Sequence, residues 1–133
     1  MIKIEKKKDF KLSNDYKIDT YNKLKSFFDY MVLMSSDTGF NRFFVRTKTH
    51  VMITILVASR SINFFSFEKL CYQIPSHVAS RSTIKSILDD GVKQSFYHKF
   101  EFKDDRRIQL YKLNSENFNL IQDWVKMQHK IFK

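Results

Sequence analysis

Apolar residues recur at helical spacing near the start of the chain. Two apolar stripes run side by side through residues 18–35: Tyr21, Leu24, Phe28 and Val32 in one, and Phe27, Met31 and Met34 in the other. Intervals of three and four residues predict a helix over 18–36. Its apolar face is wider than a surface helix needs for one core. Residues 1–15 are lysine-rich without such periodicity, and we expect a basic arm there.

Turn and capping residues divide the middle of the chain. The turn residues at 37–39 end the first helix, and 40–46 is predicted to be a connection. Thr47 can cap a helix that runs to about Arg60, with Val51, Ile55 and Leu56 facing inward. A short helix is predicted to begin at Ser66 and to break at Pro75. A further helix follows over about 80–94.

Strand character appears in two short segments, 97–102 and 108–113. The polar loop 103–107 between them has the length of a hairpin connection. Ser115 is predicted to cap a last helix over 115–132. We therefore expect a mainly α protein with a small β-hairpin, of the α+β class, in a single domain over 1–133.

The order of these elements is typical of a winged helix-turn-helix. Two helices joined by a tight turn and followed by a hairpin place a recognition helix at 80–94 and a wing at 97–113. Residues 47–113 would form a DNA-binding core, and the helices at 18–36 and 115–132 would form a dimer.

The predicted recognition helix has one apolar side. On a helical wheel Ile84, Ile87 and Leu88 cluster and must face the core. No acidic residue occurs from 76 to 86, and short hydroxyls and cations in that stretch suit contacts with base edges and phosphates. The candidate DNA-binding residues in this stretch are Ser76, His77, Ser80, Arg81, Ser82, Thr83, Lys85 and Ser86.

The hairpin loop supplies a second candidate surface. Lys103, Arg106 and Arg107 could reach the minor groove, where narrow A·T tracts attract guanidinium groups. In the alternative interpretation, Asp104 and Asp105 pair with the two arginines in a solvated turn.

These segments resemble the MarR family of bacterial and archaeal regulators. The residues that carry the resemblance are Ser80-Arg-Ser-Thr-Ile-Lys-Ser-Ile-Leu-Asp89 and Asp105-Arg-Arg-Ile-Gln-Leu-Tyr-Lys-Leu-Asn114. They are similar to the family's recognition helix and to its "D-x-R" wing ending in "L-T". The resemblance covers about 66–116 and implies a dimeric regulator that reads the major groove with 80–86 and the minor groove with Arg107. Some such proteins are released from DNA by a small effector, whose existence and identity this sequence does not give.

The chain departs from the MarR pattern at two places. Ser95 stands where the family usually has Gly before the first wing strand, and one helix rather than two follows the wing. The second departure leaves the dimer geometry open.

The net charge of +10 and the pI of about 9.7 support nucleic-acid binding less strongly than the order of the predicted elements does. A basic chain attracts nucleic acid first and an anionic membrane surface second, and the excess is spread along the sequence. An aromatic content of 16% excludes a wholly disordered chain. The single cysteine favours a reducing cytosol, and neither a secretory signal nor an apolar stretch of about 20 residues is evident. We expect a soluble, cytoplasmic, nucleoid-associated protein with no membrane partner.

Surplus apolar rows on the terminal helices predict a homodimer, because large apolar patches are uncommon on monomers. The candidate dimer residues are Phe27, Met31, Met34, Leu120, Trp124, Met127 and Ile131. The alternative is that both helices pack on each other within one chain.

Catalytic, metal and cofactor sites are not indicated. The four histidines lack metal-ligand spacing, and Cys71 has no cysteine partner, so no metal is expected. Two glycines cannot build a phosphate-cradling loop. Cys71 is expected to pack in an apolar face, with a redox-sensing thiol as the alternative.

The sequence therefore favours a sequence-specific regulator of transcription that binds double-stranded DNA and is not an enzyme. Two alternatives stay open. One is a winged-helix module for protein–protein assembly, as in replication, viral or plasmid-maintenance complexes. The other is a non-specific architectural DNA binder.

Overall fold

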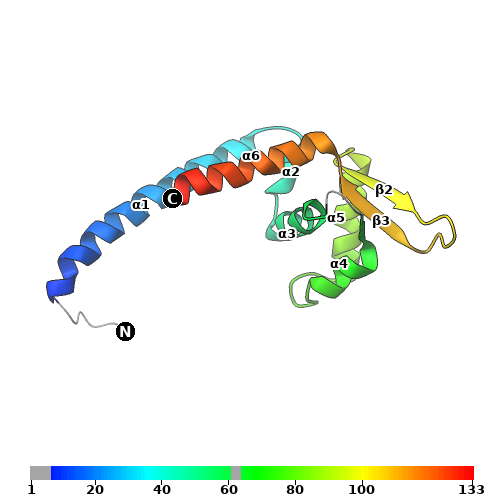
Figure 1. Cartoon of the computed structure of the whole chain (residues 1–133), viewed down its shortest axis with the longest axis horizontal. Coiled ribbons are helices and arrows are strands. Elements are labelled where there is room, and N and C mark those ends of the chain that lie inside the picture. The colour runs from blue at the N-terminus through cyan, green and yellow to red at the C-terminus, as the bar shows by residue number, and fades with distance from the viewer. Residues whose placement is uncertain (1–6, 61–63) are drawn as a thin grey trace.

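The computed structural model describes the backbone of residues 7–60 and 64–133, and the side chains of 15–60 and 64–133. Helices α1 (Lys7–Ser36) and α6 (Ser115–Phe132) lie side by side and form an arm (Figure 1). The other described elements form a body at one end of this arm. The protein is mainly helical with a small antiparallel sheet, which confirms the expected α+β class.

The body contains four helices and three strands. They are α2 (Phe40–Phe44), α3 (Lys48–Ala58), β1 (Phe65–Ser66), α4 (Phe67–Gln73), α5 (Arg81–Lys93), β2 (Tyr97–Glu101) and β3 (Gln109–Leu113). The sheet has the order β1-β3-β2 with both pairs antiparallel, and Phe65 lies opposite Tyr111. A two-residue strand is too short for periodicity to reveal, so β1 was not predicted.

Helix starts follow the capping residues. The hydroxyls of Thr47, Ser66 and Ser80 each accept a hydrogen bond from the backbone N–H three residues later, at 3.1 Å, which confirms these starts. The predicted bounds of the last helix, 115–132, are confirmed, but its predicted capping residue was wrong. Asn114, rather than Ser115, caps α6 by accepting from the N–H of Asn117 at 2.9 Å.

The core of the body lies between α3, α4, α5 and the sheet. Ile53, Leu70, Leu88 and Tyr111 are completely buried there. Ile55 was expected to face inward, yet it is exposed. The C-terminal part of α3 is apolar on every side, so periodicity could not choose the buried face. The predicted connection at 40–46 contains α2, whose three phenylalanines are all buried.

Tyr97 of β2 packs against both α3 and α5. The Tyr97 hydroxyl lies 2.6 Å from Oγ1 of Thr54, and burial raises the pKa of this tyrosine. A Cβ added to Gly91 would lie 2.5 Å from Cε2 of the Tyr97 ring. Only glycine therefore fits at this point of α5 without moving the ring.

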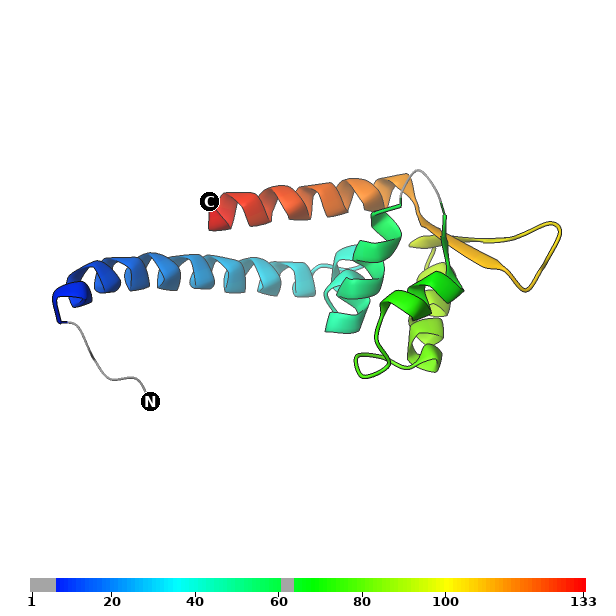
Figure 2. The ribbon, with the colours of Figure 1, turned by 60° about the horizontal axis from the view of Figure 1, so that its bottom comes forward.

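The arm extends beyond the rest of the protein. Phe27 of α1 contacts Phe132 of α6 with ring centres 5.5 Å apart, and Nζ of Lys23 donates to the backbone oxygen of Lys133 at 3.0 Å. Toward its N-terminus α1 continues past the end of α6 (Figure 2). At about 1.5 Å per residue, the 30 residues of α1 give it a length of about 45 Å.

The helix α1 also corrects the predicted basic arm at 1–15. Residues 7–15 belong to α1, whereas 1–6 lie outside the described residues. This segment has no Gly or Pro, and its lysines and leucine favour a helix even without an apolar stripe. No helix within 7–60 and 64–133 has the length and apolar character needed to cross a membrane.

Candidate nucleic-acid interface

A tight turn connects α4 to α5. The backbone N–H groups of Val78 and Ala79 both donate to the carbonyl of Pro75, at 2.9 and 3.2 Å. Ile74 and Ala79 are buried at the two ends of this turn, whereas Ser76 and His77 are exposed. The turn therefore anchors itself by apolar contacts and leaves its polar residues in solvent.

The two sides of α5 differ as the sequence predicts. Ile84, Ile87 and Leu88 are buried, which confirms the predicted inner face. On the outer side Ser82, Thr83 and Ser86 are exposed, and we call these three residues the hydroxyl face. Ser80 belongs to the helix start instead, because its hydroxyl caps α5 and bonds to Oγ1 of Thr83 at 3.0 Å.

The stretch that lacks acids in the sequence has acids near it in space. Arg81 donates two hydrogen bonds to the carboxylate of Glu68 on α4, at 3.1 and 2.7 Å, and its guanidinium lies 5.1 Å from the centre of the Phe67 ring. The hydrogen bond from Arg81 lowers the pKa of Glu68. Lys85 pairs in turn with Asp89 at 2.7 Å. Arg81 and Lys85, the two cations of the predicted recognition helix, therefore each have an anionic partner. Both partners lie outside residues 76–86, so the absence of acids from that stretch did not reveal them.

The loop between β2 and β3 is partly self-paired. Arg107 donates from Nε and Nη2 to the two carboxylate oxygens of Asp105, each at 2.9 Å, and these bonds lower the pKa of Asp105. For this pair the structure has the contact that the alternative interpretation expected. Lys103 and Arg106 are exposed and form no ion pair with any residue in 15–60 or 64–133.

A cleft beside the hydroxyl face was not predicted. It lies between the first turn of α3 and α5, has a volume of about 530 Å³, and is lined by Thr47, Thr49, His50, Ser82, Thr83, Ser86 and Ile87. Thr49 and His50 are each only 8% exposed. The signal in the sequence was the capping residue Thr47, which places the first turn of a helix nearby, but only the fold brings this turn beside α5.

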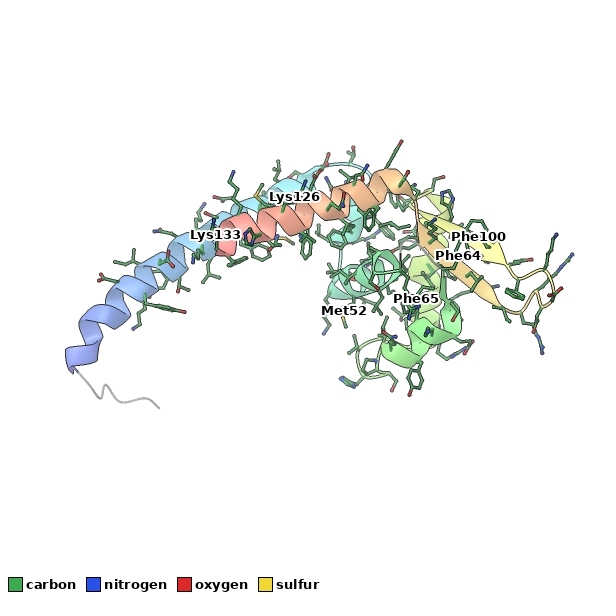
Figure 3. All side chains as sticks on the ribbon, viewed as in Figure 1. Met52, Phe64, Phe65, Phe100, Lys126 and Lys133 are labelled. Atoms are coloured by element: carbon green, nitrogen blue, oxygen red, sulfur yellow. The ribbon has the colours of Figure 1, made fainter. Side chains whose placement is uncertain are left out.

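The outward face of the sheet is unusually apolar. Phe64, Phe100, Phe102 and Ile108 are each between 40 and 46% exposed. Phe64 and Phe100 lie together on this face, with ring centres 4.6 Å apart (Figure 3), and Nζ of Lys112 is 5.9 Å from the Phe64 ring centre. The sequence predicted that Phe100 and Phe102 share one face of the hairpin, but it did not predict which residues pack beside them.

The seven candidate dimer residues are covered within one chain. Met34 is buried, Trp124 packs edge-on against Phe44 at 5.3 Å, and Phe27, Met31, Leu120, Met127 and Ile131 are half-buried. The structure thus has the contact between the two terminal helices that the alternative described. The row that it leaves exposed is the other stripe of α1, formed by Tyr21, Leu24, Phe28 and Val32, at 48 to 62%.

Two further sequence expectations concern metal ligands and Cys71. Among residues 7–60 and 64–133 no three His, Cys, Asp or Glu side chains gather as metal ligands would. Cys71 is half-buried, and this burial raises the pKa of its thiol, which disfavours the reactive thiolate.

Comparisons with protein-family models, with curated proteins and with solved structures find no match to this chain. The MarR-like family assignment therefore stays a prediction from the motifs.

Proposed function

We propose that this protein is a sequence-specific, homodimeric regulator of transcription that binds double-stranded DNA through a winged helix-turn-helix. In this proposal α5 enters the major groove and the β2–β3 loop reaches the adjacent minor groove. The observation that carries it is the hydroxyl face of α5, which is exposed along the helix while the opposite face packs into the core. Small hydroxyls allow a helix to approach base edges and phosphates closely.

The ion pairs of this surface are compatible with DNA contact. The pairs Arg81–Glu68, Lys85–Asp89 and Arg107–Asp105 all lie at the surface, where solvent and salt screen ion pairs and leave them little net strength. A phosphate can therefore replace or share the carboxylate at small cost. Arg106 and Lys103 on the hairpin loop add cations for the DNA backbone.

The proposed dimer uses the exposed stripe of α1. Tyr21, Leu24, Phe28 and Val32 lie on one side of a helix that extends past the end of its neighbour α6. An isolated helix gains little stability in water unless its apolar face packs. A second copy of the chain would cover this row and present two α5 helices to one DNA duplex. A regulator of this kind would act in the cytoplasm at the nucleoid.

Selection of bound sequences from random duplex DNA tests the proposal. We expect an enriched palindromic site, with half-sites about 10 base pairs apart, and affinity that falls steeply with salt. Ser86→Asp, which places a carboxylate on the hydroxyl face, should abolish enrichment. The matched control Asn119→Asp adds the same charge to an exposed position on α6 and should bind as the wild type does. Equal affinity for all sequences would instead indicate an architectural binder.

A second candidate function, a protein–protein assembly module, is favoured by the apolar outer face of the sheet. Exposed clusters such as Phe64, Phe100, Phe102 and Ile108 mark interaction sites on many proteins. This candidate predicts that Phe100→Ser abolishes capture of a partner protein and leaves binding to the selected DNA unchanged. The DNA-binding proposal predicts no enrichment defect in Phe100→Ser and a complete defect in Ser86→Asp, so the two variants separate the functions.

A further inference from the structure

The cleft between α3 and α5 has the composition of an anion site. Five of its seven lining residues carry a hydroxyl, a sixth is His50, and none carries a carboxylate. Ser and Thr hydroxyls and helix N-termini are frequent partners of phosphate oxygens in protein–DNA complexes. The hydroxyl face of α5 forms one wall, so the cleft borders the surface proposed to enter the groove.

The opposite wall is the first turn of α3. The first N–H groups of a helix lack partners inside the helix, and the helix dipole favours negative charge at this end. In α3 the hydroxyl of Thr47 accepts from the N–H of His50, which leaves the N–H groups of Lys48 and Thr49 directed out of the helix start. The first turn of α3 has no acidic residue.

Thr49 on this wall has a hydroxyl that is open to a ligand. The residue is more than nine-tenths buried and lines the cleft, and its hydroxyl forms no hydrogen bond with any residue whose side chain is described. This hydroxyl is not among the enclosed polar atoms that lack a partner, so it is the accessible part of a buried side chain. A ligand oxygen in the cleft would accept a hydrogen bond from it.

His50 supplies a second, equally buried group. Its Nδ1 lies 2.7 Å from Oγ1 of Thr47, and its ring packs edge-on against Phe43 at 4.9 Å. The Thr47 hydroxyl is free to donate its proton to Nδ1, an arrangement that leaves the neutral ring with its proton on Nε2. Among the residues described, Nε2 has no hydrogen-bond partner. Thr49 and His50 therefore bring two uncommitted polar groups to one cleft.

Two cations flank Thr47 in the sequence, at the start of α3. Arg46 and Lys48 are both exposed, and neither forms an ion pair within 15–60 and 64–133. Burial is the main reason that the pKa of His50 is lowered, and Arg46 lowers it further, whereas Asp90 on α5 acts in the opposite direction. Gln94 holds that carboxylate by a hydrogen bond of 3.0 Å.

We propose that the cleft formed by Thr47, Thr49 and His50 of α3 and the hydroxyl face of α5 binds one phosphate group of the DNA backbone. This inference rests on the proposed function and deepens it: the phosphate fixes the position of α5 along the duplex and so sets which bases the helix can reach. Helix α3, outside the helix-turn-helix, thereby becomes part of the interface.

The first test compares Thr49→Val with Thr20→Val. Valine has nearly the shape of threonine, so Thr49→Val removes the hydroxyl that faces the ligand and little else. We expect its affinity for random-sequence duplex DNA to fall about tenfold, the effect of one hydrogen bond to a charged group. Thr20→Val, on α1, should leave affinity unchanged. Thermal unfolding of both variants checks the fold. Wild-type affinity in a folded Thr49→Val would overturn the phosphate site while DNA binding through α5 stands.

The second test uses pH. A bound phosphate favours the imidazolium form of His50, so wild-type affinity should rise as the pH falls below about 6.5, the ordinary pKa of histidine. His50→Gln should lose this rise, and His129→Gln, at an exposed position on α6, should keep it. Retention of the full rise in His50→Gln would overturn the assignment.

A third measurement separates the two proposals. Inorganic phosphate is titrated into the wild-type protein and the ring signals of its histidines are followed by NMR. If duplex DNA does not bind but phosphate shifts His50 and leaves His129 on α6 unchanged, the DNA-binding function fails and a site for free phosphate stands. If DNA binds and phosphate leaves His50 unchanged, the function stands and the cleft is not an anion site.

Discussion

The body and the arm satisfy their apolar residues in different ways. In the body, apolar faces of α3, α4 and α5 pack against one another and against the sheet, so that Ile53, Leu70 and Leu88 are completely buried. In the arm, α1 packs one stripe against α6 and leaves the other in solvent. Two stretches with similar periodicity thus have different energetic roles. Periodicity identifies a helix, whereas the number of packed neighbours decides how much each apolar residue stabilises the fold.

The largest expected effect separates two identical substitutions. Leu88→Ala in α5 should lower the free energy of unfolding by about 2–5 kcal/mol, because it leaves a cavity in a packed core. Leu24→Ala in α1 should change it by less than about 0.5 kcal/mol, because that side chain is 54% exposed. Urea denaturation of dilute protein measures both. Similar losses for the two variants would show that the exposed stripe of α1 is packed in the single chain.

The next prediction concerns the two glycines. Gly91→Ala places a methyl group against the buried Tyr97 ring and should destabilise by about 1–3 kcal/mol, the usual cost of overpacking. Gly39 has open space around it but a φ of +81° and a ψ of −137°, a combination that almost only glycine adopts, so Gly39→Ala should cost about 1–3 kcal/mol from the backbone alone. Near-ultraviolet circular dichroism distinguishes the causes: the tyrosine signal should change in Gly91→Ala and not in Gly39→Ala. A stable Gly91→Ala with an unchanged signal would contradict the close packing.

A third prediction asks whether the exposed stripe of α1 forms a dimer interface. Leu24→Glu places a charge in the proposed contact, and the dissociation constant of the dimer should rise at least about tenfold, equivalent to ~1.4 kcal/mol. Asn22→Glu adds the same charge to α1 away from the stripe and should leave dimerisation unchanged. Sedimentation equilibrium measures both. A monomeric wild-type protein at all concentrations would remove the dimer from the proposal, and DNA binding by one chain would then be tested alone.

Local signals explain which elements could be predicted. Capping hydroxyls at Thr47, Ser66 and Ser80, the break at Pro75 and the apolar side of α5 act within a few residues, so the sequence alone placed α3, α4 and α5 closely. The start of α1 at Lys7 was missed because its first residues have no apolar stripe. The stripes of α1 and α6 were both visible, but the choice of which stripe packs internally depends on how two distant helices meet.

The candidate site shows the same division. The hydroxyl face could be predicted because it lies on one helix. The pairing of Arg81 with Glu68 joins residues on two helices, and the cleft joins Thr49 and His50 to residues of α5 that lie more than thirty positions later in the sequence. No local sequence pattern predicts such contacts, because they depend on how α3 and α4 pack against α5. Residues 76–86 do lack acidic residues, as the sequence shows. The surface that they form nevertheless has carboxylates beside it, those of Glu68 and Asp89.

The smallest expected effect lies at the junction of α5 and the hairpin. Ser95 has a φ of +66°, in the left-handed region that favours glycine, and its backbone is held by bonds from its N–H to Val92 and from Asn114 to its carbonyl. Ser95→Gly relieves this strain but gives the unfolded chain more freedom, so a gain in stability below about 1 kcal/mol is expected. Ser95→Val should destabilise instead, because a β-branched side chain rarely adopts positive φ. Thermal unfolding ranks the three proteins. If valine proves as stable as glycine, the left-handed conformation is not maintained in solution, and the connection from α5 to β2 has a different geometry.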